Sequence, residues 1–364
     1  MKSIVNTFSG GTRNGTPVAP RRRVAAWLAA LALCSTAAHA QLGLATLSSP
    51  ELSGPVTVFY PSLDADQPVQ REQRGQTALM AAESGAPAPG NGRLIVISHG
   101  SGGGPWTFTD LARRWAQAGF VVALPEHQGD NWHDVKDAGP ASWKRRPLEI
   151  SHAIDAVLAD ARWAGRLDTN KVGMYGMSAG GHTALVLAGG RWSPARLDAH
   201  CEAHIGEDFN TCVGLAAELN GGPFDGLKKA IARFVLRHLL TDATEQQHTD
   251  PRIAAIAAEV PLAADFDFAT LAQPVVPVGL VRAGSDRWLV PRFHIDRVRA
   301  ACAACELLAD LPEAGHGAFL SPPVPNPPPL LRKLLSYDEP IAPAQVQQAH
   351  ERLVDYFKRM LLDR

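Results

Sequence analysis

Short apolar runs alternate with helix-compatible stretches along most of the chain after residue 93. Residues 94–98 form a continuous apolar run, which is typical of a strand buried on both faces. Residues 107–118 then carry large apolar side chains at helical spacing, and another apolar run follows at residues 120–124. This rhythm predicts an α/β fold, with a doubly wound, mostly parallel sheet and helices on both of its faces.

The same pattern predicts further elements before and after this region. Further strands are expected at residues 56–61, 253–260, 277–283 and 306–311. Further helices are expected at residues 147–164, 183–188, 224–240, 266–272, 292–300 and 343–362. Residues 64–92 and 126–146 are rich in polar and turn-forming residues, so we expect loops there. Residues 191–250 interrupt the rhythm, and we expect them to form a cap inserted over the strand ends where such sheets carry their chemistry.

The first 40 residues have a different pattern. A basic region ends at Arg23, residues 24–33 form a short apolar core, and Ala38-His39-Ala40 resembles an A-x-A cleavage site. The apolar core is shorter than the ~20 residues that span a bilayer. Residues 1–40 are therefore predicted to be a signal peptide that is removed before Gln41, which implies an exported, periplasmic or secreted protein.

Composition and cysteine usage narrow the class of protein. The 364 residues carry a net charge of −1, which argues against nucleic acid as a partner, and 46% are hydrophobic, which is enough for a full core. Beyond the signal peptide four cysteines remain, an even number that favours disulfides in an exported chain. We expect the local pairs Cys201–Cys212 and Cys302–Cys305, although other pairings are open. Because the sequence holds only one C-x-x-C, no metal site is expected.

The segment Gly176-Met177-Ser178-Ala179-Gly180 carries the G-x-S-x-G pattern between an apolar run and a helix-compatible stretch. This is the context of a nucleophile elbow, in which the serine lies on a sharp turn with its hydroxyl exposed. The flanking glycines lack a Cβ, so the strand and the helix can approach each other closely. Ser178 is therefore the candidate nucleophile.

A serine hydroxyl needs a base to accept its proton and a third group to orient that base. In the strand–elbow–helix architecture the acid and then the histidine follow the serine along the chain. Asp286 follows the strand expected at residues 277–283, and His316 follows the last expected strand between small residues. We therefore assign Asp286 as the orienting acid and His316 as the base. Glu259, at the end of the preceding strand, is the alternative acid.

The glycine-rich loop Ser98-His99-Gly100-Ser101-Gly102-Gly103 follows the strand at residues 94–98. Acyl transfer places negative charge on the carbonyl oxygen, and two backbone N–H groups aimed at that oxygen stabilise it. We expect the N–H groups of Ala179 and Ser101 to form this oxyanion hole, with Gly102 as the alternative loop donor. The loop lacks the lysine of a phosphate-binding loop and the glycine spacing of a dinucleotide site.

Together these motifs resemble the α/β-hydrolase superfamily, and within it the bacterial dienelactone-hydrolase-like and platelet-activating-factor-acetylhydrolase-like esterases. The matching segments are Ser98–Gly103, Pro125-Glu126-His127, Gly176–Gly181, Gly284-Ser285-Asp286 and Ala314-Gly315-His316. Dienelactone hydrolases carry a cysteine nucleophile where this chain has Ser178. The acetylhydrolases carry their acid one strand earlier, where this chain has Glu259. The resemblance implies that residues 41–364 form one α/β-hydrolase domain.

This resemblance implies a serine hydrolase that cleaves carboxylic esters of small molecules or lipids, acetyl esters among them, through an acyl-enzyme on Ser178, and the signal peptide implies that it is exported. Such chemistry needs neither a metal nor an organic cofactor. A peptidase on the same fold, or an inactive hydrolase scaffold that only binds ligands, are the alternatives. Residues 227–237 form a basic amphipathic stretch, which is expected either to contact a lipid surface transiently or to pack on the core.

Overall fold

The fold is described from a computed structural model, which describes residue 11, residues 41–72 and residues 76–363. The predicted signal peptide therefore lies outside the described residues, apart from residue 11. The strands are β1 (Gln41–Leu47), β2 (Val56–Ser62), β3 (Gln67–Glu72), β4 (Gln76–Glu83), β5 (Leu94–Ser98), β6 (Val121–Pro125), β7 (Val172–Met177), β8 (Arg191–Trp192), β9 (Ile253–Glu259), β10 (Phe266–Asp267), β11 (Val278–Ala283) and β12 (Glu306–Leu311). The α-helices are α1 (Thr109–Gln117), α2 (Pro140–Ala159), α3 (Ala179–Leu187), α4 (Pro194–His204), α5 (Phe209–Val213), α6 (Asp225–Leu239), α7 (Ile295–Ala301), α8 (Pro329–Leu334) and α9 (Pro343–Leu361).

Ten of the described strands form one sheet in the order β12-β11-β9-β7-β5-β6-β2-β1-β4-β3. The strands from β12 to β6 run parallel to one another, whereas β2 pairs with β6 and with β1 in the antiparallel direction. A mostly parallel sheet with crossover helices confirms the predicted α/β class. The carboxyl ends of β5, β7, β11 and β12 consequently lie along one edge, where the predicted site residues follow them.

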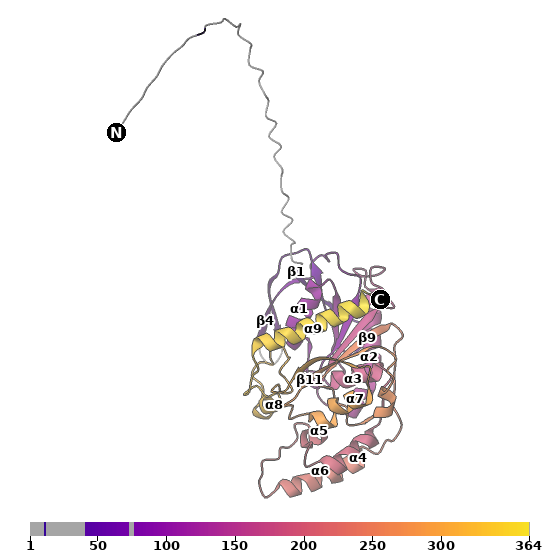
Figure 1. The fold of residues 1–364 in the computed structure, drawn as a ribbon, viewed down its shortest axis with the longest axis vertical. Coiled ribbons are helices and arrows are strands. Elements are labelled where there is room, and N and C mark those ends of the chain that lie inside the picture. Colours follow the sequence, from indigo (N-terminus) through magenta and orange to yellow (C-terminus); the bar gives the residue numbers. More distant parts are fainter. Residues whose placement is uncertain (1–10, 12–40, 73–75, 364) are drawn as a thin grey trace, which may run out of the picture. The chain divides into compact units, whose positions relative to one another are not determined.

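Alternate residues of the central strands pack into two separate hydrophobic clusters. In β5, Leu94 and Val96 belong to the cluster that contains residues of α2 and α3, whereas Ile95 and Ile97 belong to the cluster that contains residues of α1 and α9. Because successive side chains of a strand point to opposite faces, the two clusters lie on the two sides of the sheet. Figure 1 shows α9 lying along the sheet close to α1.

Two segments predicted to be loops contain regular structure. Residues 64–92 include β3 and β4, an antiparallel pair at the edge of the sheet, where polar residues are tolerated and weaken the strand pattern. The helix predicted at residues 147–164 is α2, which begins earlier, at Pro140, and ends at Ala159. Proline suits the first position of a helix because its missing N–H is not needed there. The prediction failed because the first turns of α2 are polar in sequence, although Arg146 is fully buried.

Residues 191–250 contain β8, α4, α5 and α6. A disulfide joins Cys201 of α4 to Cys212 of α5, and a second one joins Cys302 to Cys305. Figure 1 shows α6 beside α4, and α6 also contacts α5. The helix predicted at residues 224–240 is thus present as α6, but none of its residues is buried.

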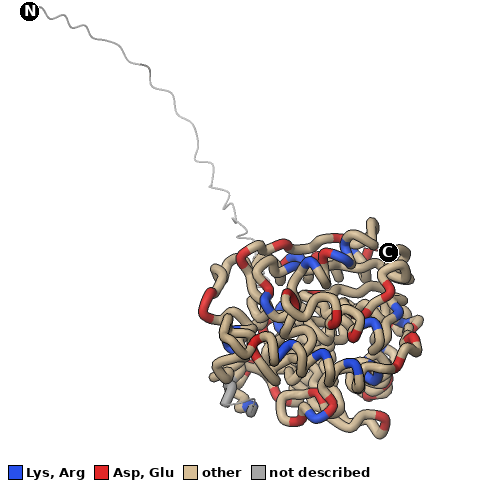
Figure 2. The backbone as a smooth tube through the Cα atoms, turned by 90° about the horizontal axis from the view of Figure 1, so that it is seen from below, with Lys and Arg blue, Asp and Glu red and all other residues tan. Residues whose placement is uncertain are grey.

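Charges of both signs are mixed along the backbone face drawn in Figure 2, which shows no large area of a single sign. Among the described helices, none combines the length and the apolar composition needed to cross a membrane.

Candidate active site

Ser178 occupies a strained turn between β7 and α3. Its φ of 60° lies in the left-handed region, which side chains other than glycine adopt rarely. A Cβ added to Gly176 would lie 1.9 Å from the carbonyl oxygen of Gly180, and one added to Gly180 would lie 1.8 Å from that of Ser98. Neither position can hold a side chain, and the turn lifts the Ser178 hydroxyl above the end of the strand.

The structure brings Ser178, His316 and Asp286 together from three distant parts of the chain. Nε2 of His316 lies 2.9 Å from Oγ of Ser178, and Nδ1 lies 2.6 Å from Oδ2 of Asp286. His316 and Asp286 are buried, whereas Ser178 is half-buried. This network assigns the imidazole proton to Nδ1, which donates to Asp286, and leaves Nε2 to accept the serine proton.

Asp286 is itself held by the backbone. Its Oδ1 accepts hydrogen bonds from the N–H groups of Trp288 at 2.8 Å and Leu289 at 2.9 Å. The ring of Trp288 also packs on that of His316, with 5.2 Å between centroids. The carboxylate and the imidazole are therefore both fixed before a substrate binds, which is the arrangement that an orienting acid requires.

Glu259, the alternative acid, does not contact His316. Its Oε2 accepts a hydrogen bond of 2.7 Å from the Tyr175 hydroxyl, and its Oε1 is buried with no hydrogen-bond partner among the described residues. Burial without a nearby cation raises the pKa of Glu259 to about 8. A carboxyl with this pKa is mostly protonated at neutral pH, so it is poorly suited to stabilise an imidazolium.

The loop after β5 lies directly beside Ser178, because a Cβ on Gly100 would be 3.3 Å from that of Ser178. The N–H of Gly102 donates to Oδ1 of Asp130 at 3.0 Å, so it is not available to a substrate. The N–H groups of Ser101 and Ala179 have no acceptor among the described residues. Of the two loop donors considered from the sequence, the geometry thus favours Ser101.

A buried ion pair that sequence reasoning missed lies beneath this loop. Oδ1 of Asp130 accepts from Oγ of Ser101 at 2.6 Å, and its Oδ2 accepts from Arg146 at 2.8 Å. Arg146 also donates to the carbonyl oxygen of His99 and to Oγ of Ser142. The guanidinium is the main attractive charge that lowers the pKa of Asp130 to about 2, against the opposing effect of burial.

The cavity next to Ser178 is small, with a volume of about 60 Å³. The loop after β5, Trp288 and His316 form part of its wall, and Leu320, Val324, Leu331 and Leu335 close it. None of the residues that line it comes from the segment 191–250, so the prediction that this segment covers the site does not match the lining. The cover comes instead from the proline-rich segment after His316 and from α8.

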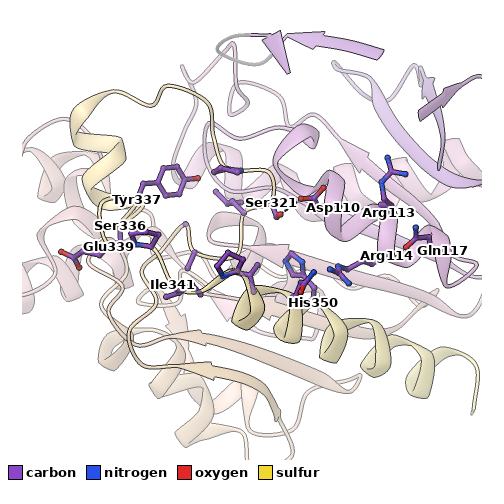
Figure 3. A pocket seen from close by; sticks show the side chains of 18 residues that line it. Asp110, Arg113, Arg114, Gln117, Ser321, Ser336, Tyr337, Glu339, Ile341 and His350 are labelled. Carbon is purple, nitrogen blue, oxygen red and sulfur yellow. Dashed lines mark hydrogen bonds between the residues drawn. The ribbon is translucent and has the colours of Figure 1, made fainter. Parts of the chain in front are cut away.

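A separate hollow of about 600 Å³ lies between α1, α9 and residues 317–341. In Figure 3, Arg113, Arg114 and Gln117 of α1 lie near His350 of α9 at one end of it. Neither Ser178 nor Asp286 lines this hollow. Burial lowers the pKa of His350 to about 4, so this histidine is neutral at pH 7. The hollow is therefore not part of the site around Ser178.

A second serine–histidine–carboxylate chain lies below the loop. Oγ of Ser98 is 2.7 Å from Nε2 of His127, and Nδ1 of His127 is 2.6 Å from Oε2 of Glu149. All three side chains are buried, and none of them lines the cavity beside Ser178. Burial and the positive charge of Arg146 keep the pKa of His127 well below its usual range.

His200 of α4 takes part in a buried group of hydrogen bonds around Asp208. His200 and His294 both contact Oδ2 of Asp208, at 2.8 and 3.0 Å. These bonds to the two histidines hold the pKa of Asp208 below its usual range, although burial opposes them. Within the part of the chain that the structure describes, no group of three or more potential ligands is arranged to hold a metal ion.

The sheet, the elbow after β7 and the order of serine, acid and histidine define the class of protein. These features are those of the α/β-hydrolase superfamily, to which the dienelactone hydrolase family belongs. Within that superfamily, residues 50–207 match the model of the dienelactone hydrolase family. The matched segment contains Ser178 and the loop after β5, whereas Asp286 and His316 lie beyond it. None of the curated proteins compared with the chain matches it.

Proposed function

We propose that this hydrolase is an exported serine esterase that cleaves carboxylic esters through an acyl-enzyme on Ser178. The observation that carries the proposal is the continuous chain of hydrogen bonds from Ser178 through His316 to Asp286, beside two N–H groups that have no acceptor within the described residues. Nucleophile, base, orienting acid and oxyanion donors are the complete set that acyl transfer requires. The mechanism uses no metal and no organic cofactor.

In the proposed reaction, Nε2 of His316 removes the proton from Oγ of Ser178 as the oxygen attacks the ester carbonyl. The oxyanion of the tetrahedral intermediate is stabilised by the N–H groups of Ala179 and Ser101. His316 then donates its proton to the leaving alcohol as the ester bond breaks. Water repeats the sequence on the acyl-enzyme, releases the carboxylic acid and restores Ser178. Asp286 holds the imidazole in place and stabilises its charged form.

The size of the cavity beside Ser178 supports a short acyl group, such as acetyl. A cavity of about 150 Å³ holds benzene, and the cavity here measures about 60 Å³. Its apolar cover, which includes Leu331 and Leu335 of α8 and the adjoining turn, suits the methyl end of such a group. The alcohol portion, which can belong to a small molecule or a lipid, would extend toward solvent.

In this proposal, residues 191–250 do not contact the substrate but contact residues that hold His316 in place. Oγ1 of Thr211 in α5 donates to the carbonyl oxygen of Trp288, which packs on His316. The disulfide between Cys201 and Cys212 joins α4 to α5 and so braces this contact. Two disulfides also suit the oxidising compartment that export of the mature chain would reach.

A panel of p-nitrophenyl esters of increasing acyl length tests both the reaction and the pocket. We expect the highest kcat/KM for acetate, with a progressive fall for butyrate, octanoate and longer chains. Labelling with a fluorophosphonate should modify Ser178 alone. Folded protein that neither hydrolyses these esters nor reacts with the probe would contradict the proposal and favour a scaffold that only binds ligands.

A further inference from the structure

The orienting acid lies on a short loop after β11, residues 286–290, which we name the acid loop. Two N–H groups of this loop donate to the carboxylate of its first residue, Asp286. The next N–H along the loop, that of Val290, donates to Oδ1 of Asp208 at 3.2 Å. Three consecutive amides of the acid loop are thus held by two carboxylates, one of which comes from another part of the chain.

Asp208 is itself held in a buried cluster. It directly precedes α5 and is only 1% exposed. Its Oδ2 lies 2.8 Å from Nε2 of His200 and 3.0 Å from Nε2 of His294. The N–H of Ala263 donates to Nδ1 of His294 at 2.9 Å, so the ring proton of the neutral His294 lies on Nε2 and is donated to Asp208. The direction of the Asp208 carboxylate is therefore fixed from several sides.

The same cluster also supports the turn that carries the nucleophile. The N–H of Leu262, the residue before Ala263, donates to the carbonyl oxygen of Ser178 at 3.2 Å. Oγ1 of Thr211 lies 3.0 Å from Nε2 of His294 and donates to a carbonyl oxygen of the acid loop at 3.1 Å. The cluster around Asp208 therefore contacts both the acid loop and the loop behind the nucleophile.

We propose that Asp208 is a positioning residue, which fixes the acid loop and thereby the direction in which Asp286 meets His316. The inference rests on the ester hydrolysis proposed above. The imidazole of His316 becomes a cation during that reaction, and the carboxylate beside it must keep its place in both states. A displacement of about 1 Å by a change far from the reacting atoms can cost about 100-fold in rate. The amides that hold the Asp286 carboxylate belong to the loop that Asp208 anchors.

A buried carboxylate can also serve only the stability of the fold, and Asp250 provides the matched control for that role. Asp250 is 7% exposed and accepts three hydrogen bonds from Arg252. Both residues precede β9 and so lie at its amino end, whereas the acid loop follows the carboxyl end of the parallel strand β11. Replacement of Asp250 should therefore cost stability without changing the rate of the folded enzyme.

The first test compares Asp208→Asn with Asp250→Asn in the hydrolysis of p-nitrophenyl acetate, with urea unfolding to define conditions in which both are folded. The side-chain amide of asparagine has only one oxygen, so either the acid loop or the two imidazoles lose their acceptor. We expect kcat of Asp208→Asn to fall by about 10–100-fold, with KM changed by less than about twofold. Asp250→Asn should keep the wild-type kcat.

A double-mutant cycle with Asp286 separates positioning from a general loosening of the site. In the Asp286→Asn background, Asp208→Asn should lower kcat by less than about threefold further, because the carboxylate that it positions is already lost. The full loss in both backgrounds would overturn the proposal. If Asp208→Asn does not fold, Thr211→Val removes a single bond to the acid loop, and it should lower kcat by about threefold to tenfold with the same dependence on Asp286.

NMR of the proton on Nδ1 of His316 gives a readout that needs no turnover. This proton lies in the short buried contact with Asp286 and should give a low-field signal that Asp286→Asn removes. Asp208→Asn should shift or broaden the signal, and Asp250→Asn should not. If the wild type hydrolyses no ester but the signal responds in this way, the proposed function fails while the positioning role stands. The positioning role is overturned if Asp208→Asn leaves the signal unchanged or matches the kcat of Asp250→Asn.

Discussion

Among the residues that the structure describes, two serine–histidine–carboxylate chains have nearly equal distances. In one, Ser178, His316 and Asp286 are joined by contacts of 2.9 and 2.6 Å. In the other, Ser98, His127 and Glu149 are joined by contacts of 2.7 and 2.6 Å. Distances between these groups therefore do not distinguish a catalytic arrangement from a structural one.

The surroundings of the two serines differ. Ser178 lies on a turn with a φ of 60°, faces a cavity and has nearby N–H groups that find no acceptor in the described part of the chain. Ser98 is the last residue of β5 and is fully buried beneath the loop that follows that strand. A carbonyl can reach only the first serine, and only there would its oxyanion find donors. The buried chain instead fixes the strand end from which the loop with Ser101 departs.

Replacing each serine by alanine is the strongest test of this contrast. Ser178→Ala should lower kcat for p-nitrophenyl acetate by about 10⁶-fold, because the nucleophile is lost. Ser98→Ala should lower it by less than about tenfold and should instead destabilise the fold by about 1–3 kcal/mol, since His127 loses a buried partner. Steady-state kinetics and urea unfolding measure the two effects. Equal losses of kcat in two folded variants would show that the contrast is wrong.

Asp286 and Glu259 are the two buried carboxyl groups considered as the orienting acid, and the next test separates them. Asp286→Asn should reduce kcat by about 10⁴-fold, because the amide no longer holds the imidazole in the required tautomer. Glu259→Gln should leave kcat nearly unchanged, because Glu259 contacts Tyr175 and not His316. If the kinetics of the two variants were reversed, Glu259 would be the acid, as in the acetylhydrolases that the sequence resembles.

Much of the central sheet could be predicted from the sequence, since burial on both faces produces continuous apolar runs. The predicted bounds of β5 and β12 agree with the structure. The hairpin of β3 and β4 was missed because an edge pair needs no such pattern. The cover by α8 and the preceding proline-rich segment was missed because the position of a loop over a cavity depends on tertiary contacts.

In the candidate site, too, some residues could be predicted from the sequence and others could not. Ser178, Asp286 and His316 could be selected because each follows a strand, and parallel strands bring their carboxyl ends to one edge. Arg146 gave no such signal. Arg146 lies in a polar segment that was predicted to be a loop. Its role in the site depends on its burial next to Asp130, which the sequence does not show. Sequence patterns report periodic burial, whereas a single buried cation is specified only by the folded structure.

The Asp130–Arg146 pair lies between the two serine chains, and its removal should have an intermediate effect. Asp130→Asn should lower kcat by about 10–100-fold with little change in KM, because the loop that carries the Ser101 N–H loses its anchor. Asp137→Asn is the matched control, since Asp137 pairs with the neighbouring Arg145 at 2.7 Å in a more exposed position. This control should retain activity. Equal kinetics for the two variants would contradict the anchoring role.

The last prediction concerns the stability of the fold around Glu259, the carboxyl that belongs to neither chain, and no change in activity is expected there. Its pKa is raised from 4.5 to about 8 in the folded state by burial. The folded state therefore binds more protons than the unfolded state between these values, and stability from this group is lost as pH rises through about 8. Glutamine keeps an acceptor for Tyr175 but cannot ionise. Relative to the wild type, Glu259→Gln should thus gain about 1 kcal/mol of unfolding free energy per pH unit between about pH 5 and 8. Urea unfolding of both proteins across that range measures the difference, and parallel pH profiles would show that the Glu259 carboxyl ionises with an ordinary pKa.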